Sequence, residues 1–293
     1  PGRLHGGKHV ARTKGAAMQE AAKDWIGRTR TMTDVITPRL LAEFRVMLGD
    51  RCGPGEIPAG FMWCLAPDIH DAQELGRDGH PRLGLFLPDL SLPRRMWAGG
   101  EVRYSAPFAL HDTVTRTSTI TDVTFKQGRS GDLGFVAVEH VYDSVRGPCV
   151  SERHDIVYRS DPDPDRPAAT PPAGDAWAAL HAWRVTPDTV MLFRYSAMTF
   201  NGHRVHYDLP YAQGIEGYPG LVVHGPMQAT WLQNLAASIF GAHPGVFRYR
   251  GLSPLFVGQP VTIEAIDSEA GLDLRVRRDA DGVVTMQASA ERG

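Results

Sequence analysis

The sequence lacks the features that mark many specialised classes of protein. Its 293 residues contain only three cysteines, Cys52, Cys64 and Cys149, and none of them form a Cys-x-x-Cys pair. This odd, scattered set favours reduced, buried thiols in the cytoplasm over a disulfide framework. The net charge is only -2, so no basic excess points to nucleic acid. No apolar run approaches the roughly 20 residues of a membrane helix, and we expect no membrane partner.

Several catalytic signatures are missing as well. The chain has no GxSxG elbow, no Walker loop and no GxGxxG fingerprint, so triad hydrolysis, nucleotide chemistry and hydride transfer lose support. What is present is ordinary, since 42% hydrophobic and 22% charged residues are typical of a globular protein. The length allows two domains or one large one.

Composition divides the chain into four segments. Residues 1–20 carry basic side chains with no acid before Glu20, and we expect a flexible tail there. Five prolines make residues 161–176 an extended linker. On either side lie comparable halves, which we predict to be an N-terminal domain at 21–160 and a C-terminal domain at 177–293.

The two halves resemble each other. The first contains YSAPFALHDTVT and the second LSPLFVGQPVT, and both Pro107–Pro254 and Val114–Val261 are separated by 147 residues. Strand-like segments follow each match, at 114–123 and 135–142, and at 261–266, 272–276 and 283–288. Equal spacing and equal position within each half favour a duplication.

Each half also has one strong helix signal ahead of its strands. Thr37 can cap a helix that begins at Pro38 and carries an apolar face. A second helix, from Pro226 to Phe240, is apolar almost all round and is therefore expected to be buried. The simplest arrangement is a central helix wrapped by a curved antiparallel sheet. Two such units predict an α+β pseudo-dimer within one chain.

The segment NGHRVHYD, residues 201–208, concentrates polar and titratable side chains in a turn. Its histidines and aspartate could ligate a metal, although the spacing is loose and HExxH is absent. They could equally form a polar turn that satisfies backbone groups. A third reading is acid–base chemistry, because a neutral histidine can move a proton at pH 7.

The apolar helix that follows favours the third reading. It opens at His224-Gly225-Pro226, and a helix N-terminus presents unpaired N–H groups and partial positive charge. Gly225 allows an oxygen to approach the backbone closely. Together these features predict an oxyanion site for a thioester or another carbonyl.

Two long segments, YSAMTFNGHRVHYDLPYA and GYPGLVVHGPMQA, resemble the MaoC-like double hot-dog (R)-specific enoyl-thioester hydratases. The similar branch is that of mesaconyl-CoA hydratase and the mitochondrial-type 3-hydroxyacyl-thioester dehydratases. WIGR, ELGRDGHP, PRRMWAGG and KQGRSG in the first half resemble the same branch. The resemblance covers about residues 25–290. It implies a hot-dog fold with two antiparallel sheets, each around a central helix, and neither a metal nor a prosthetic group.

The hydratase motif has the form D-x-N-P-x-H-x-D-x-x-x-A. On this pattern His206 matches the catalytic histidine, Asp208 the later aspartate and Ala212 the small residue. Asn201 stands at the catalytic aspartate and His203 at the asparagine. Because an amide cannot take up a proton, Asn201 can only orient water or substrate. The resemblance thus leaves base chemistry to His206, with help from His203. Asp208 is expected either to fix a histidine tautomer or to support the turn.

The expected reaction is reversible addition of water across C2–C3 of an acyl thioester. Gly225 would polarise the carbonyl, and His224 would line the site or cap the helix. Candidate substrate-binding residues are Arg94, Arg95, Lys126 and Arg129 for coenzyme A phosphates, Arg204 for Asp208 or a substrate carboxylate, and Trp97 for the acyl pocket. Solvated charge and core packing are their alternative explanations.

Two other functions compete with the hydratase. One is a hot-dog protein that binds acyl thioesters without catalysis, which the Asn201 substitution keeps open. The other is an acyl-CoA thioesterase, for which Glu216 is the nearby carboxylate, in a loop that we expect to be flexible. The expected partner is an acyl-CoA or an acyl-carrier-protein thioester. A homodimer is also expected, because exposed edge strands favour association.

Overall fold

The computed structural model describes residues 22–128, 131–162 and 171–293. The predicted tail at 1–20, residues 163–170 of the predicted linker and the candidate Arg129 lie outside these described residues. The boundaries proposed for the two domains stay predictions.

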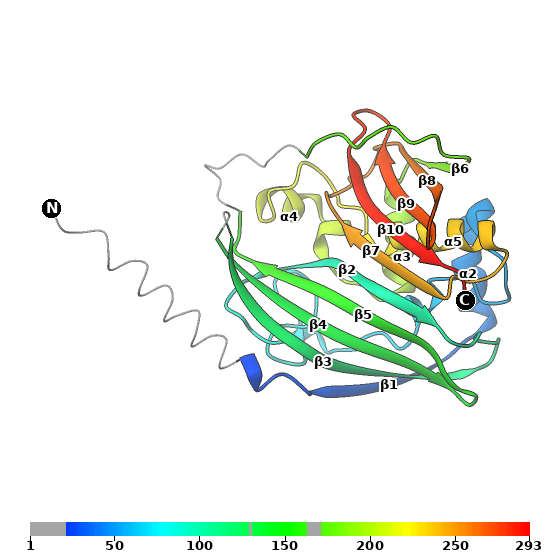
Figure 1. Ribbon diagram of the computed structural model, residues 1–293. Helices are drawn as coiled ribbons and strands as arrows, with labels where there is room; N and C mark the ends of the chain where they lie inside the picture. The colour runs from blue at the N-terminus through cyan, green and yellow to red at the C-terminus, as the bar shows by residue number, and fades with distance from the viewer. Residues whose placement is uncertain (1–21, 129–130, 163–170) are drawn as a thin grey trace.

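Ten strands form one antiparallel sheet in the order β1-β3-β4-β5-β2-β7-β10-β9-β8-β6 (Figure 1). The strands of the first half are β1 Thr29–Val35, β2 Arg94–Tyr104, β3 Thr113–Gly128, β4 Gly131–Ser144 and β5 Gly147–Arg159. Those of the second half are β6 His181–Val185, β7 Val246–Gly251, β8 Val261–Ser268, β9 Gly271–Arg278 and β10 Val284–Glu291.

The two halves repeat one topology. β1-β3-β4-β5-β2 and β6-β8-β9-β10-β7 follow the same order, and the halves meet where β2 pairs with β7. Glu101 lies opposite Arg248 across this junction and forms an ion pair with it at 2.6 Å. Val114 and Val261 lie in β3 and β8, the equivalent third strands. The predicted double hot-dog is therefore present, with its two sheets joined edge to edge.

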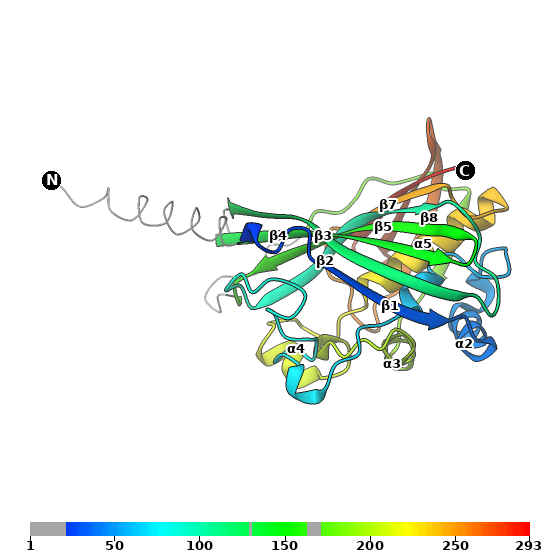
Figure 2. The same cartoon turned by 90° about the horizontal axis from the view of Figure 1, so that it is seen from below.

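The helices are α2 Pro38–Leu48, α3 Thr189–Met198, α4 Leu209–Gly214 and α5 Gly225–Phe240. Short 3-10 turns are η1 Gly49–Arg51, η2 Phe61–Cys64, η3 Ala72–Glu74 and η4 Arg204–His206. Figure 2 shows α2, α3 and α4 gathered on one side of the sheet. None of the helices in the described ranges combines the length and hydrophobicity that a membrane crossing needs.

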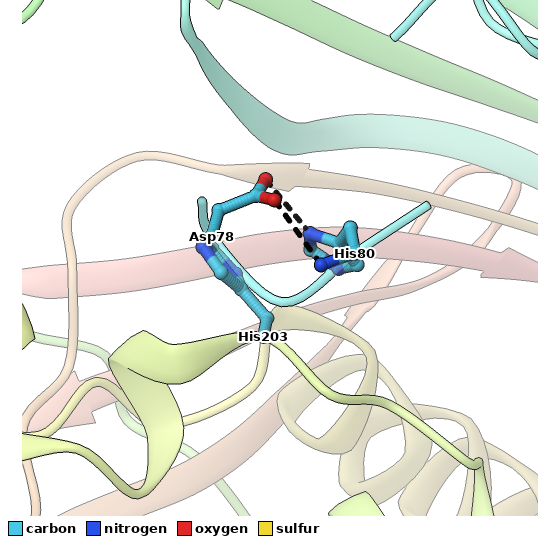
Figure 3. Close-up of side chains that lie close together, drawn as sticks. All are labelled: Asp78, His80 and His203. Atoms are coloured by element: carbon cyan, nitrogen blue, oxygen red, sulfur yellow. Dashed lines mark hydrogen bonds and ion pairs between the residues drawn. The ribbon is translucent and has the colours of Figure 1, made fainter. Parts of the chain in front are cut away.

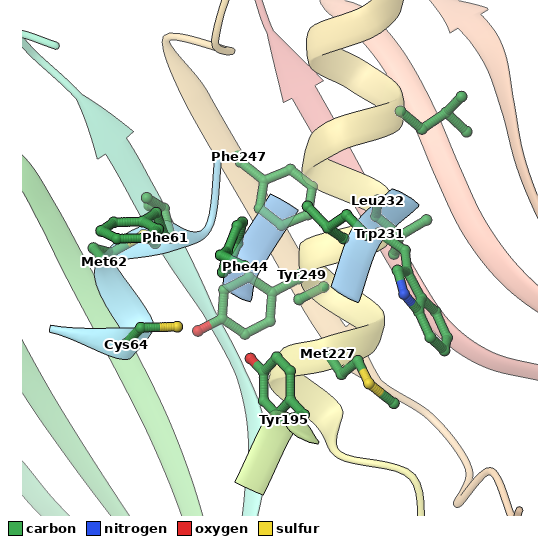
Figure 4. Close-up of a cluster of buried hydrophobic side chains, with 14 of the residues drawn as sticks. Phe44, Phe61, Met62, Cys64, Tyr195, Met227, Trp231, Leu232, Phe247 and Tyr249 are labelled. Atoms are coloured by element: carbon green, nitrogen blue, oxygen red, sulfur yellow. The ribbon is translucent and has the colours of Figure 1, made fainter. Parts of the chain in front are cut away.

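Helix α5 is enclosed, as its sequence predicts. Every residue from Met227 to Ala237 is buried, and the helix packs against β6, β8, β9 and β10. Figure 4 shows Trp231 and Leu232 of α5 in the central core with Phe247 and Tyr249 of β7. This packing holds the N-terminus of α5 in a fixed place beneath the sheet.

Helix α2 begins as predicted, with Pro38 in the first turn and the Thr37 hydroxyl accepting a hydrogen bond from the backbone N–H of Leu40 at 3.2 Å. Its apolar face contacts η2, where Phe44 meets Phe61 edge-on at 5.2 Å. Beyond this, α2 packs mainly on α3 and η1. The two halves thus share a topology while their helices differ in environment.

Candidate active site

The turn between α3 and α4 carries the predicted cluster. Phe200 has a left-handed φ of 50°, and Asn201 then accepts a hydrogen bond at Oδ1 from the His203 backbone N–H at 2.9 Å. Residues 204–206 form η4, and Asp208 Oδ1 caps α4 by accepting from the Tyr211 N–H at 3.1 Å. Local side-chain-to-backbone bonds of this kind fix the turn and aim its histidines inward.

His206 is buried, and its tautomer is fixed by the backbone. Its Nδ1 lies 2.7 Å from the carbonyl oxygen of Val222. Because a carbonyl only accepts, Nδ1 carries the hydrogen and Nε2 keeps a free lone pair. Burial lowers the pKa of His206 to about 4, so the ring is neutral at pH 7. A neutral imidazole with a free nitrogen is a general base.

His224 stacks on His206, with ring centroids 3.6 Å apart and planes at 20°. Its Nε2 lies 2.8 Å from the Ser196 hydroxyl, and its side chain makes no capping bond to α5. Burial, with the nearby rings of His206 and His203, lowers its pKa well below the usual value. Of its two expected roles, the structure favours lining the cluster, while only its backbone occupies the N-cap position.

The start of α5 is packed against an aromatic wall. A Cβ on Gly225 would lie 2.6 Å from Cε3 of Trp97. Trp97 in turn stacks on Tyr249 at 4.4 Å and meets Trp63 edge-on at 5.5 Å. Glycine is thus needed here for the approach of Trp97, in addition to the expected approach of a substrate oxygen. A β-bulge between Trp97 and Gly99 marks where β2 bends at this point.

A loop of the N-terminal half completes the cluster. The backbone N–H of Arg204 donates to the carbonyl of Asp78 at 2.8 Å. Gly79 has a φ of 86°, and a Cβ there would lie 2.1 Å from the Gly202 carbonyl oxygen. The His80 ring consequently reaches that of His203, with centroids 4.4 Å apart (Figure 3). Sequence reasoning missed this contribution, although His80 lies in the ELGRDGHP segment that carries the family resemblance.

Asp78 accepts hydrogen bonds that connect this loop to β2. Its Oδ2 accepts from Nδ1 of His80 at 3.2 Å and from Nε of Arg95 at 3.3 Å. Burial by itself would raise the pKa of Asp78, but the His80 bond and the Arg95 charge outweigh it and hold the pKa below its usual range. The carboxylate is therefore ionised. Burial lowers the pKa of His80, and the bond from Asp78 opposes this shift.

Within the part of the chain that the structure describes, Asp78, His80 and His203 could hold a metal ion, since their ligand atoms lie within 4.8 Å of one another. Histidine and carboxylate suit zinc. However, the fixed charge of Arg95 already occupies the carboxylate oxygen that faces His80. These residues fit a hydrogen-bonded group better than a cation site, and the expected absence of a metal stays a prediction.

Asp208 and Arg204 form a pair of their own. Arg204 donates to Asp208 Oδ2 from Nε at 2.9 Å and from a terminal nitrogen at 2.7 Å, and its guanidinium lies over the Tyr211 ring. Of the two roles expected for Asp208, the structure shows support of the turn. Asp208 does not fix the tautomer of His206, because the Val222 carbonyl does so and Asp208 accepts from Arg204 and Tyr211.

The basic candidates that the structure describes, Arg94, Arg95 and Lys126, are engaged within the protein. Arg94 forms a buried ion pair with Glu216, which also accepts from the Tyr211 hydroxyl at 3.2 Å. A phosphate would have to break that pair. Glu216 lies in a loop after α4, as expected, but its side chain is only 7% exposed and is held by Arg94. Arg95 holds Asp78 and the Pro81 carbonyl. Lys126 lies over the Phe135 ring, 5.1 Å from its centroid.

Comparison with known proteins gives close relatives and a shared fold. The chain is 37% identical over 277 residues to the mesaconyl-C(4)-CoA hydratase of Chloroflexus aurantiacus, covering 92% of this chain and 97% of the relative. It is 29% identical over 215 residues to the mitochondrial hydroxyacyl-thioester dehydratase type 2 of Schizosaccharomyces pombe, covering 64% and 71% of the two chains.

Solved structures support the fold at low sequence identity. HtdX of Mycobacterium tuberculosis superposes with a TM-score of 0.64 at 16% identity, over 91% of this chain and all of that one. A second M. tuberculosis protein, described as a double hot-dog fold, gives 0.53 at 14% identity, over 91% and 96%. The profile of the family described as hydroxyacyl-thioester dehydratase type 2 matches residues 60–257. The chain therefore belongs to the hydroxyacyl-thioester dehydratase type 2 family.

Proposed function

We propose that the protein is a hydro-lyase that reversibly adds water to an α,β-enoyl thioester and so forms the 3-hydroxyacyl thioester. Membership of the dehydratase family and the similarity to a mesaconyl-CoA hydratase support this reaction class. The observation that carries it is His206, whose Nδ1 is held by the Val222 carbonyl and whose Nε2 is left free. His224, stacked on His206, leads directly into α5.

In this proposal the thioester carbonyl binds at the N-terminus of α5. The Gly225 N–H and the helix dipole stabilise the negative charge that develops on the carbonyl oxygen. His206 acts as a base toward the water by accepting a hydrogen bond through Nε2, which activates the oxygen as it bonds to C3. The amide of Asn201 orients that water, with His203 beside it. A proton then reaches C2, and the reverse sequence removes water.

The acyl group that we propose is short and branched or dicarboxylic, as in mesaconyl-CoA. The similarity over 97% of the mesaconyl-C(4)-CoA hydratase is one support. The other is the wall of Trp97, Trp63 and Tyr249 against Gly225, which favours a compact acyl group near the helix start. We propose coenzyme A as carrier, with Arg204 at 40% side-chain exposure as a candidate for a substrate carboxylate.

A thioesterase is less well supported. Its candidate carboxylate, Glu216, is buried against Arg94 and Tyr211 and is not free to attack a thioester carbon. The non-catalytic binder is separated from the hydratase by the experiment that follows.

The test is loss of the enoyl-thioester absorbance of crotonyl-CoA and mesaconyl-CoA. We expect His206→Ala to lower kcat by about 10²- to 10⁴-fold, because general acid–base help has that size. His181→Ala, at an exposed position of β6, is the matched control and should be as active as the parent. Near-normal activity of His206→Ala would refute the assignment, and saturable ester binding without turnover by the parent would indicate the binder.

Location in the cytoplasm and a homodimer are further proposals. The sheet ends at β1 and β6, which each pair on one side only and so offer edges for association. Sedimentation of the purified protein at several concentrations would show whether two chains associate.

A further inference from the structure

Four histidine rings form a continuous row in the candidate site. His80 contacts His203 at 4.4 Å, His203 contacts His206 at 5.3 Å, and His206 stacks on His224 at 3.6 Å. Three of the four come from the C-terminal half. His80 comes from the N-terminal half and is, in the described ranges, the member of the row whose ring is bonded to a carboxylate.

We propose that His80, held by Asp78, is a second base of this site and carries the proton of the attacking water. The N-terminal half would thereby supply the carboxylate-backed group that Asn201 cannot provide. The inference rests on the proposed hydration reaction and assigns a catalytic role to His80 and a positioning role to Asp78.

The hydrogen bonds define which nitrogen of His80 is available. The ionised Asp78 accepts from Nδ1–H, so Nε2 keeps its lone pair, as it does in His206. The two bases differ in their partners. Val222 offers His206 a neutral carbonyl, whereas Asp78 offers His80 a negative charge. A positive imidazolium is stabilised more by a carboxylate, as in a serine–histidine–aspartate triad.

Exposure also distinguishes the two rings. The His80 side chain is 27% exposed, while His206 as a residue is 8% exposed. His80 therefore lies at the open end of the row, and His206 lies inside it. A substrate entering from the open end would meet the His80 ring as well as Nε2 of His206.

The proposed step balances with these groups alone. The water donates one O–H to Nε2 of His206 and the other to Nε2 of His80. As the water oxygen bonds to C3, the proton goes to His80 and the C2–C3 π electrons move toward the thioester, which becomes an enolate at the start of α5. The enolate then takes that proton from His80 at C2. His80 returns to its neutral form, and no oxidant or metal is consumed.

The loop that presents His80 is held firmly enough for this task. Gly79 and Gly202 pass each other at backbone contact, and the Arg204 N–H bonds to the Asp78 carbonyl. The charged and titratable groups facing His80 are Asp78 in its own loop, Arg95 on β2 and, at longer range, Asp68. The other rings of the row, His203, His206 and His224, face it as well. Asp78 and Asp68 favour the protonated ring, and Arg95 opposes it.

The experiment compares His80→Gln and Asp78→Asn with the parent in the hydration assay. His80→Gln should lower kcat by about 10²-fold or more while KM changes little. Asp78→Asn can still accept from Nδ1–H but lacks the charge, so we expect a loss of about tenfold. His70→Gln is the matched control, because His70 pairs with Glu74 at 3.0 Å in the same loop. It should be as active as the parent.

The pH profile separates a catalytic role from a structural one. The acid limb of kcat/KM reports the free enzyme's base. Asp78 raises the pKa of His80, so Asp78→Asn should move that limb to lower pH. A purely structural role would lower the profile without moving the limb.

Three results would overturn the inference. The first is a His80→Gln variant that is as active as the parent. The second is an Asp78→Asn variant that unfolds at the parental temperature and whose kcat/KM profile keeps its acid limb at the same pH. The third is activity that is lost when metal ions are chelated and restored by zinc. Each of these leaves the hydratase function standing, since the parent still turns over. Absence of turnover by the parent itself would instead remove the proposed function.

Discussion

The lack of a side chain at Gly225 allows Trp97 to pack directly against the N-terminus of α5. Any larger residue would clash, because a Cβ at this position would lie 2.6 Å from the indole of Trp97. We expect Gly225→Ala to cost about 1–3 kcal/mol of unfolding free energy through overpacking. It should also lower kcat, because the displaced N–H binds the carbonyl less well. Urea unfolding and the hydration assay would measure the two effects.

A second substitution checks the cause. If the clash with the indole is responsible, the double variant Trp97→Leu, Gly225→Ala should lose less unfolding free energy than the sum of the losses in the two single variants. Effects of substitutions at contacting residues are generally not additive. Strictly additive losses would show that another contact is responsible.

Single residues differed in how far the sequence revealed them. His206, His224 and Gly225 belong to two nearby segments, so their spacing and the family resemblance were sufficient. Asp78 and His80 lie more than a hundred positions earlier, and only the packing of Gly79 on Gly202 brings them to the cluster. Glu216 lies in a loop, as its glycine-rich surroundings indicated, but its burial was not foreseen, because that burial depends on Arg94 in β2.

At the scale of elements, the N-cap of α2 gives a direct stability test. Thr37→Ala removes the acceptor for the Leu40 N–H and should lower the unfolding free energy by about 1 kcal/mol. Thr37→Ser keeps a hydroxyl in the same place and serves as the control. Chemical denaturation would measure both. Equal losses in the two variants would mean that the methyl group, rather than the cap, is responsible.

Elements with clear periodicity or turn chemistry were predictable. The α2 and α5 helices and the strands β3, β4, β8, β9 and β10 all lie where the patterns indicate. The β2 strand could not be predicted from the sequence. It is paired on both edges, and its sequence, RRMWAGGEVRY, shows no simple alternation of apolar and polar residues. Helix α3 exposes Val190 and Phe193, so its apolar residues do not mark one face.

At the scale of the whole molecule, buried neutral histidines make stability depend on pH. Among the residues that the structure describes, the pKa values of seven histidines are lowered mainly by burial, namely His80, His140, His154, His203, His206, His224 and His243. The unfolded chain binds protons at these rings below about pH 6.5, and the folded chain does so only at lower pH. Stability should therefore fall as pH drops from about 6.5 toward 4. For His206, a folded pKa of about 4 corresponds to a loss on the order of 3 kcal/mol.

One buried acid acts in the opposite sense. Burial raises the pKa of Glu152 to about 7, so its contribution is present at low pH and is lost as pH rises through that value. Because these seven histidines oppose one glutamate, we expect the melting temperature to decrease from pH 6.5 to 4.5. Differential scanning fluorimetry across this range would measure it. A flat or rising melting temperature toward pH 4.5 would contradict the expectation.

The sequence indicated the repeat but not how the halves meet. Val114 and Val261 lie in the equivalent strands β3 and β8, and Pro107 and Pro254 lie in the segments that precede them. The pairing of β2 with β7 depends on two edges that have no local signal, so one continuous sheet could not be read from either half.

The mixed origin of the histidine row has a consequence for how this chain can change over generations. In a homodimer of identical subunits, every substitution is inherited by both sites at once. Here both copies of the repeat lie in one chain, so a substitution in one half leaves the other half unchanged. One copy retains FNGHRVHYD while the other, free of that motif, supplies Asp78 and His80 to its neighbour. The two halves therefore share a topology while each holds different residues of one site.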